Sequence, residues 1–149
     1  MTPQKLNTFT LLKLPSAWLC GVRVKEIDNS QCLVKVKHGW INQNPFKSMF
    51  WAVQGMAAEM TTGVLVMKQI KESGRSVSML VLNMNANFSK KAVGKVNFVC
   101  KDGHLVGSAI QQAIATGKGQ TIWMKSVGVD EKGDVVSTFN FEWTLKVKG

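Results

Sequence analysis

The sequence predicts an α+β fold in which a curved antiparallel sheet wraps around one long central helix. Residues 49–71 have the length and composition of a helix that is apolar nearly all round, so other elements must enclose it on most sides. Most of the remaining chain alternates between apolar and polar residues, as strands with one buried face do. A strongly curved sheet that holds the helix in its concave face satisfies both patterns.

Length and composition agree with a single folded domain over residues 1–149. Hydrophobic residues make up 45% and charged residues 19%, which excludes intrinsic disorder. The net charge of +10 suits a polyanionic partner, namely nucleic acid, an anionic membrane or a phosphorylated carrier, without choosing among them. Cys20, Cys32 and Cys100 form no close pair, so we expect neither a disulfide scaffold nor a metal site. We find no export signal and expect a cytoplasmic protein.

The elements before the long helix are short. A helix is predicted over residues 4–12, stopped by Pro15. Residues 21–27 and 31–37 are β-rich runs separated by Asp28-Asn29-Ser30, which predicts a hairpin. After a polar loop, Ser48 is the expected N-cap of the long helix, and Gly74 ends it.

Four strands are predicted after the long helix, over residues 76–88, 96–100, 120–129 and 135–147. A second helix over residues 103–115 separates the middle two, with Asp102 before it and Gly117 after it. Strict alternation in the first of these strands places Asn83, Asn85 and Asn87 on the same face as Val77. In the last strand, Ser137 alone interrupts the inward-facing apolar set.

Glu59 is the only charged side chain between Ser48 and Met67. Its carboxylate would cost at least ~2.5 kcal/mol near a bilayer centre, so we interpret the segment as a buried core helix. A buried carboxylate must be hydrogen-bonded, protonated or open to a functional cleft, where a raised pKa produces general acids and bases. A Glu59 that caps a neighbour or bonds to the sheet backbone is the equally weighted alternative. Thr62 lies one turn further on the same face and is placed to orient the carboxylate.

The start of the long helix offers free backbone N–H groups near Phe50, Trp51 and Ala52. They carry partial positive charge, which stabilises an oxyanion that develops at this end of the helix. The alternative is that these groups meet water or a loop carbonyl.

The stretch from Asn44 to Gly63 resembles the helix motif of hotdog-fold acyl-CoA thioesterases, most closely the phenylacetate-pathway type. That motif runs from an Asn through His-Gly-Gly to an Ala-acid pair and a Gly one turn later. Asn44, Ala58-Glu59 and Gly63 fall at matching places, whereas residues 50–52 replace His-Gly-Gly and the usual Asp is a Glu. Residues 88–94 are similar to the aromatic and basic segment after the family's third strand. Over residues 14–147 the chain also resembles an uncharacterised branch of this superfamily.

The resemblance implies a hotdog fold and a cofactor-independent hydrolase that cleaves the thioester of an acyl-CoA or acyl-carrier substrate. It implies a homodimer or a dimer of dimers formed by sheet extension, with the active site at the subunit interface. The resemblance implies that Glu59 is a general base or nucleophile and that the N–H of Trp51 or Ala52 forms the oxyanion hole. It places Phe50 and Thr62 beside the substrate and implies that Asn44 holds the loop or the attacking water. Lys90 and Lys91 are implied to contact the phosphates of coenzyme A.

Two other functions stay open. A non-catalytic acyl-CoA-binding protein is one, because Trp51 stands where a glycine normally lets the substrate approach. Nucleic-acid binding is the other, suggested by the charge alone. The aromatic residues lie at inward strand positions and no nucleic-acid motif is found, so we expect neither a nucleic-acid nor a membrane partner. Lys90 and Lys91 are equally open to interpretation as solvated lysines of a turn.

Overall fold

The computed structural model describes all 149 residues. Its elements are α1 (Pro3–Lys13), α2 (Pro15–Leu19), β1 (Arg23–Ile27), β2 (Cys32–Lys37), the 3-10 helix η1 (Trp40–Asn42), α3 (Trp51–Ser73), β3 (Val77–Phe88), β4 (Lys95–Cys100), α4 (Gly103–Thr116), β5 (Gln120–Asp130) and β6 (Val135–Val147). The order agrees with the predicted hairpin, long helix and four strands with an inserted helix. The short helices α2 and η1 were not predicted.

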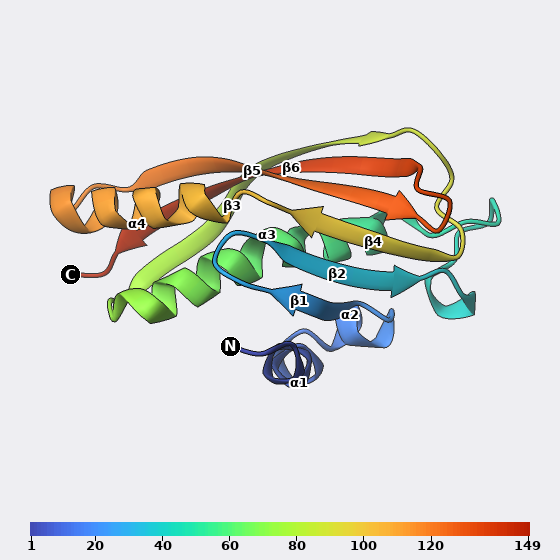
Figure 1. Cartoon of the computed structure of the whole chain (residues 1–149), viewed down its shortest axis with the longest axis horizontal. Coiled ribbons are helices and arrows are strands. Elements are labelled where there is room, and N and C mark those ends of the chain that lie inside the picture. Colours follow the sequence, from blue (N-terminus) through green and yellow to red (C-terminus); the bar gives the residue numbers. More distant parts are fainter.

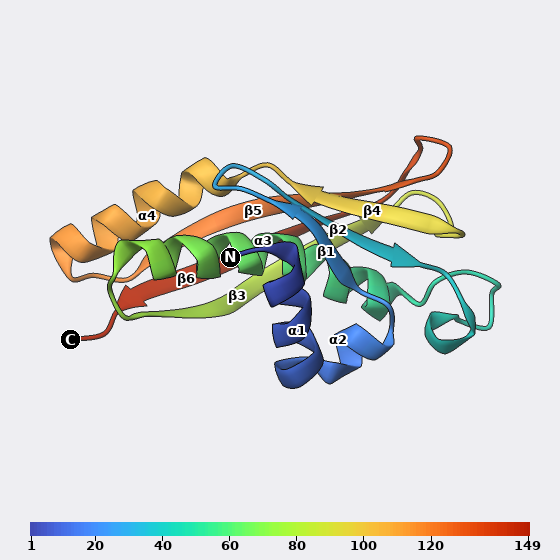
Figure 2. The ribbon, with the colours of Figure 1, turned by 60° about the horizontal axis from the view of Figure 1, so that its bottom comes forward.

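Six antiparallel strands form one curved sheet in the order β1-β2-β4-β5-β6-β3. The long helix α3 runs along the inner face of this sheet, and α4, which follows β4, lies beside the C-terminal part of α3 (Figure 1). In the rotated view, α1 and α2 lie beside β1 (Figure 2). The strand β3 forms the opposite edge, and no element of the chain pairs with its outer side. The predicted α+β architecture, a curved sheet around one helix, is confirmed.

The core lies between α3 and the inner face of the sheet. Ala57 and Leu65 of α3 are fully buried, as are Phe98 of β4 and Phe139 of β6. Burial of one such aromatic side chain contributes about 1.5–3 kcal/mol, and truncation to alanine also leaves a cavity, for a total cost of about 3–5 kcal/mol. Gly128 of β5 leaves room for Phe98, because a Cβ there would lie 2.5 Å from the Phe98 ring. This packing fixes α3 relative to the strands.

A β-bulge at Leu82 exchanges the two faces of β3. Val81 pairs with Trp143 and Asn83 with Glu142, so Leu82 is the extra residue. After the bulge, Met84 lies opposite Phe141 on the inner face. The inner residues beyond the bulge are Met84, Ala86 and Phe88, and the outer residues are Asn83, Asn85 and Asn87. The predicted strict alternation was wrong at this point, because one inserted residue reverses the face of every later side chain.

The start of α3 also differs from the prediction. Its N-cap is Phe50, which makes no side-chain cap, and Ser48 is buried in the preceding loop against Asn44. The first N–H groups of α3 therefore have no side-chain acceptor. The other end is as predicted, since Gly74 closes the helix with a left-handed φ of 70°. No helix of the chain combines the length and apolar character needed to cross a membrane.

Candidate functional site

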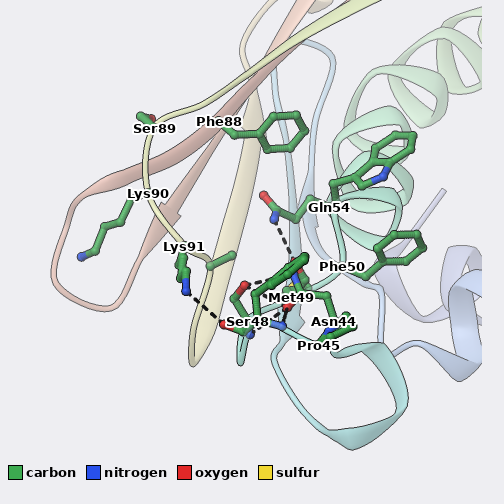
Figure 3. Close-up of a pocket in the computed structure, with 13 residues that line it drawn as sticks. Asn44, Pro45, Ser48, Met49, Phe50, Gln54, Phe88, Ser89, Lys90 and Lys91 are labelled. Atoms are coloured by element: carbon green, nitrogen blue, oxygen red, sulfur yellow. Dashed lines mark hydrogen bonds between the residues drawn. The ribbon is translucent and has the colours of Figure 1, made fainter.

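A pocket of about 790 Å³ opens at the N-terminal end of α3 (Figure 3). Three segments build its walls: the loop before α3, the first turn of α3 and the loop that follows β3. Phe50, Trp51 and Phe88 give it apolar surface, while Asn44 and Lys91 are among its polar groups. An apolar lining with a few convergent polar groups is the usual character of a small-molecule site.

Asn44 organises the loop that leads into α3. Its Nδ2 donates to the Ser48 hydroxyl at 3.0 Å, and its Oδ1 accepts from the Phe46 N–H at 2.8 Å and the Ser48 N–H at 3.2 Å. These bonds close the tight loop in which Lys47 adopts a φ of 63°. Of the two roles that the resemblance implied for Asn44, the hydrogen bonds support the holding of the loop.

Two backbone donors at the start of α3 are free. The N–H groups of Trp51 and Ala52 have no acceptor in the chain, whereas the Phe50 N–H donates to the Asn42 oxygen at 2.9 Å. The next two amides, of Val53 and Gln54, both donate to the Phe50 oxygen. The helix dipole adds partial positive charge at the same place. The N–H groups of Trp51 and Ala52 can therefore stabilise an anion, whereas Phe50 only lines the pocket with its side chain.

Glu59 faces β6, toward the β3 edge of the sheet. Gly55 and Gly63, one turn before and one turn after it, lie against Phe139 and Trp143 of β6. The Glu59 carboxylate accepts no hydrogen bond within the chain, and both of its oxygens reach solvent, since no buried side-chain oxygen of the chain lacks a partner. The side chain is otherwise half-buried, and burial raises the pKa of this carboxyl above its ordinary value. The alternative that Glu59 is bound to scaffold atoms does not hold.

The Thr62 hydroxyl does not contact the Glu59 carboxylate. It donates to the backbone oxygen of Glu59 at 2.9 Å and accepts from Nε1 of Trp143 at 2.9 Å. Thr62 is fully buried, so it anchors α3 to β6 instead of orienting the acid.

The two lysines after β3 differ in their surroundings. Lys90 Nζ lies 2.7 Å from carboxylate oxygens of both Asp130 and Asp134, which raise the pKa of Lys90. Lys91 Nζ donates to the Phe46 backbone oxygen at 3.1 Å and has no carboxylate partner. Lys90 points away from the other lining side chains, whereas Lys91 reaches the loop before α3 (Figure 3). The uncompensated positive charge at the pocket is that of Lys91.

The chain gathers only part of the predicted site. Asn44, Phe50, Trp51, Lys90 and Lys91 line the pocket, and the free N–H of Ala52 lies at the same helix end. Glu59 and Thr62 are not part of its lining. Because an α-helix rises 1.5 Å per residue, Glu59 lies about 12 Å along the axis from Trp51.

Sequence reasoning missed a buried polar pair at the pocket, formed by Gln54 and Ser137. The Ser137 hydroxyl donates to Gln54 Oε1 at 2.7 Å, and both side chains are buried. One signal was visible in the sequence, since Ser137 is the residue that interrupts the apolar face of β6. Its partner lies 83 positions away along the chain, so only the fold identifies it.

The family described as a domain of unknown function (DUF4442) matches residues 3–145. No curated protein matches the sequence. Among solved structures, a Pseudomonas aeruginosa protein of unknown function, described as a probable thioesterase, is 19% identical with a TM-score of 0.84, and the match covers 98% of this chain and 97% of that one. A thioesterase from Haemophilus influenzae is 14% identical with a TM-score of 0.76, over 99% and 92% of the two chains.

A third neighbour is a Staphylococcus aureus thioesterase that is 15% identical. Its structure with a glutamine replaced by alanine at position 32 gives a TM-score of 0.66 over 84% of this chain and 93% of that one. The same protein was also solved with a glutamate replaced by alanine at position 47. At these identities the likeness establishes a common fold, the hotdog architecture that the resemblance implied.

Proposed function

The chain belongs to the DUF4442 family and has the hotdog fold of the neighbours above, and on this basis we propose that it hydrolyses acyl thioesters. The observation that carries the proposal is the pair of free N–H groups of Trp51 and Ala52 beside a pocket, on the same helix as the unpartnered, half-buried Glu59 carboxylate. Oxyanion donors and a general base with a raised pKa are the two devices that acyl transfer to water requires.

In the proposed reaction, the thioester oxygen accepts hydrogen bonds from the Trp51 and Ala52 amides. Glu59 takes a proton from a water molecule whose oxygen attacks the carbonyl carbon. The resulting tetrahedral oxyanion collapses, the carbon–sulfur bond breaks, and the sulfur takes up the proton from Glu59. The products are the carboxylic acid and the free thiol. A direct attack by Glu59 through an acyl anhydride, which water then hydrolyses, gives the same products.

The separation of about 12 Å along α3 prevents one chain from applying both devices to one substrate, because catalytic groups must lie within about 3 Å of the reacting atoms. We therefore propose that the site is shared by two copies of the chain. Antiparallel pairing of the exposed β3 edges would run the two α3 helices in opposite directions and bring each Glu59 toward the other helix start. Leu80 and Leu82 of β3 are 63% and 53% exposed, and such an open apolar edge is a template for pairing.

The acyl group is proposed to come from coenzyme A or from an acyl carrier, both of which hold it on a phosphopantetheine arm. Support comes from the free charge of Lys91 at the pocket and from the net charge of +10. Lys90 is less suited to this role because Asp130 and Asp134 already balance its charge.

The second candidate is a protein that binds acyl-CoA without cleaving it. Trp51 favours it, because this large side chain lines the pocket at the helix end that carries the free amides, where the related motif has a glycine. Calorimetry that detects tight binding of acyl-CoA esters, together with no release of free thiol at any acyl-chain length, would establish this function instead.

The test of hydrolysis is the release of free thiol from a series of acyl-CoA esters, measured with a chromogenic thiol reagent. The wild-type protein should release thiol from at least one member of the series. Glu59→Gln should lose about 10²–10⁴-fold in kcat, the contribution of a positioned general base, while its thermal unfolding stays cooperative. Equal turnover by the wild-type protein and a folded Glu59→Gln variant would exclude Glu59 as the catalytic group.

A further inference from the structure

Gln54 places a side-chain amide inside the pocket. It lies one turn beyond Trp51 on α3, and only 4% of its surface is exposed. Helical side chains lean toward the N-terminus of their helix, so this amide is directed to the end where the free backbone donors lie. Figure 3 shows the Gln54 side chain reaching into the space between Phe88 and Met49.

The hydrogen bonds of Gln54 fix the orientation of its amide. Its Oε1 accepts from the Ser137 hydroxyl at 2.7 Å, so the NH₂ group is turned to the other side. There Nε2 donates to the Met49 backbone oxygen at 3.3 Å, beyond the usual range of such bonds. An NH₂ group carries two donors, and the chain supplies an acceptor for one of them only. The second donor is left for a molecule in the pocket.

Packing does not explain this polar pair. Ser137 is fully buried on the same strand face as Phe139 and Phe141, where an apolar residue would fit the pattern. Replacing both members of a buried hydrogen-bonded pair by apolar groups of the same shape can be nearly neutral for stability. Gln54 lines the pocket, is held by Ser137 and keeps one spare donor, which is the arrangement expected of a group that contacts substrate.

We propose that Gln54 is a further catalytic residue, which donates its free N–H to the thioester carbonyl oxygen alongside the backbone amide of Trp51. Ser137 is the positioning residue that holds the amide in this orientation. The inference rests on the proposed thioester hydrolysis and adds a side-chain donor to an oxyanion hole that the backbone alone would otherwise form. It also explains why Gln54, one turn from the start of α3, carries a polar side chain.

The first test is the kinetics of Gln54→Met, which keeps the length of the side chain and removes its amide. We expect kcat for acyl-CoA hydrolysis to fall about 10²–10³-fold, as for the loss of an oxyanion donor, with little change in KM. Gln111→Met removes an exposed glutamine of α4 and is the matched control, with unchanged kcat. Ser137→Ala should lower kcat by a smaller factor at unchanged KM, and Ser137→Thr should restore part of the loss.

The second test separates this inference from the proposed function. An acyl-CoA labelled at its carbonyl carbon is bound to Glu59→Gln, and its carbonyl resonance is compared with that in the Glu59→Gln, Gln54→Met double variant. A downfield shift that shrinks in the double variant supports the contact, whether or not the protein turns the ester over. Identical resonances, or a folded Gln54→Met variant with wild-type kcat beside an inactive Glu59→Gln, would overturn the role of Gln54 and leave the hydrolysis proposal intact. Should Gln54→Met not fold, Gln54→Leu takes its place in both tests.

Discussion

The indole Nε1 of Trp143 donates a 2.9 Å hydrogen bond to Oγ1 of Thr62, joining β6 to α3 one turn beyond Glu59. The Thr62 hydroxyl in turn donates to the backbone oxygen of Glu59. The backbone that carries the acid is therefore tied to the sheet, while the carboxylate itself has no partner. Substitutions of the Glu59 side chain should leave α3 in place, so their effects report on the carboxylate alone.

The pH dependence of hydrolysis should follow the ionisation of Glu59. Only the ionised carboxylate can take a proton from water, so kcat/KM should rise with pH. Because burial raises the pKa of Glu59, the midpoint of this rise should lie above the ordinary value of 4.5. Initial rates measured from about pH 4 to pH 9 give the profile. A rate that is already constant at and above pH 4.5 would contradict the assignment of Glu59 as the base.

The ionisation of Glu59 should also make the free energy of unfolding depend on pH. Because its pKa is raised on folding, the Glu59 carboxyl binds more protons in the folded than in the unfolded protein between pH 4.5 and the folded pKa. Its contribution to the free energy of unfolding is thus fully present below pH 4.5 and is lost as pH rises through the folded pKa. Glu59→Gln carries no such proton. In urea titrations at several pH values, the variant should gain stability relative to the wild-type protein as pH rises, and a constant difference would refute the burial effect.

The Trp51 amide can be removed without breaking α3. Trp51 is the first residue of the helix, where proline is well tolerated, and its N–H has no acceptor to lose. Phe50 has φ −59° and ψ 133°, which suits a residue before proline. Trp51→Pro removes the side chain and the donor, and Trp51→Ala removes the side chain alone. We expect kcat of the proline variant to be about 10²–10³-fold below that of the alanine variant, and equal kcat values would exclude the Trp51 donor.

The two lysines after β3 should contribute unequally to coenzyme A binding. Lys91→Ala should raise KM for an acyl-CoA about two- to fivefold, the range of a solvent-exposed ion pair, with kcat unchanged and a smaller effect at high salt. Lys90→Ala should change KM less, because Asp130 and Asp134 already pair with Lys90. Steady-state kinetics of both variants at two salt concentrations measure these changes in KM. A larger increase in KM for Lys90→Ala than for Lys91→Ala would contradict the assignment of Lys91 as the main phosphate contact.

Periodicity was sufficient for most of the fold. The long apolar run predicted α3 within a few residues, and the alternating segments predicted all six strands. The N-cap of α3 is Phe50 and not the predicted Ser48, because Ser48 is hydrogen-bonded to Asn44 within the preceding loop. The bulge at Leu82 escaped prediction, since alternation cannot reveal an extra residue inside a strand.

The candidate site was less accessible to sequence reasoning. The resemblance identified residues close together along the chain, such as Asn44, Trp51 and Glu59, but the neighbours that decide their state lie far away. The two salt bridges of Lys90 connect it to carboxylates that lie 40 and 44 positions away along the chain, and the hydrogen bond from Ser137 to Gln54 spans 83 positions. Such contacts arise only when strands and helix pack together.

The most direct test of the shared site mixes two variants that are each inactive in thiol release, Glu59→Gln and Trp51→Pro. Refolded together in equal amounts, half of their dimers are mixed, and each mixed dimer holds one intact site. The mixture should therefore recover about a quarter of the wild-type rate. Adding Leu80→Lys on the β3 edge of both variants should abolish this recovery by blocking pairing. Recovery that depends on β3 is the predicted result, and a mixture no more active than its separate components would contradict catalysis by Glu59 of one copy at the helix start of the other.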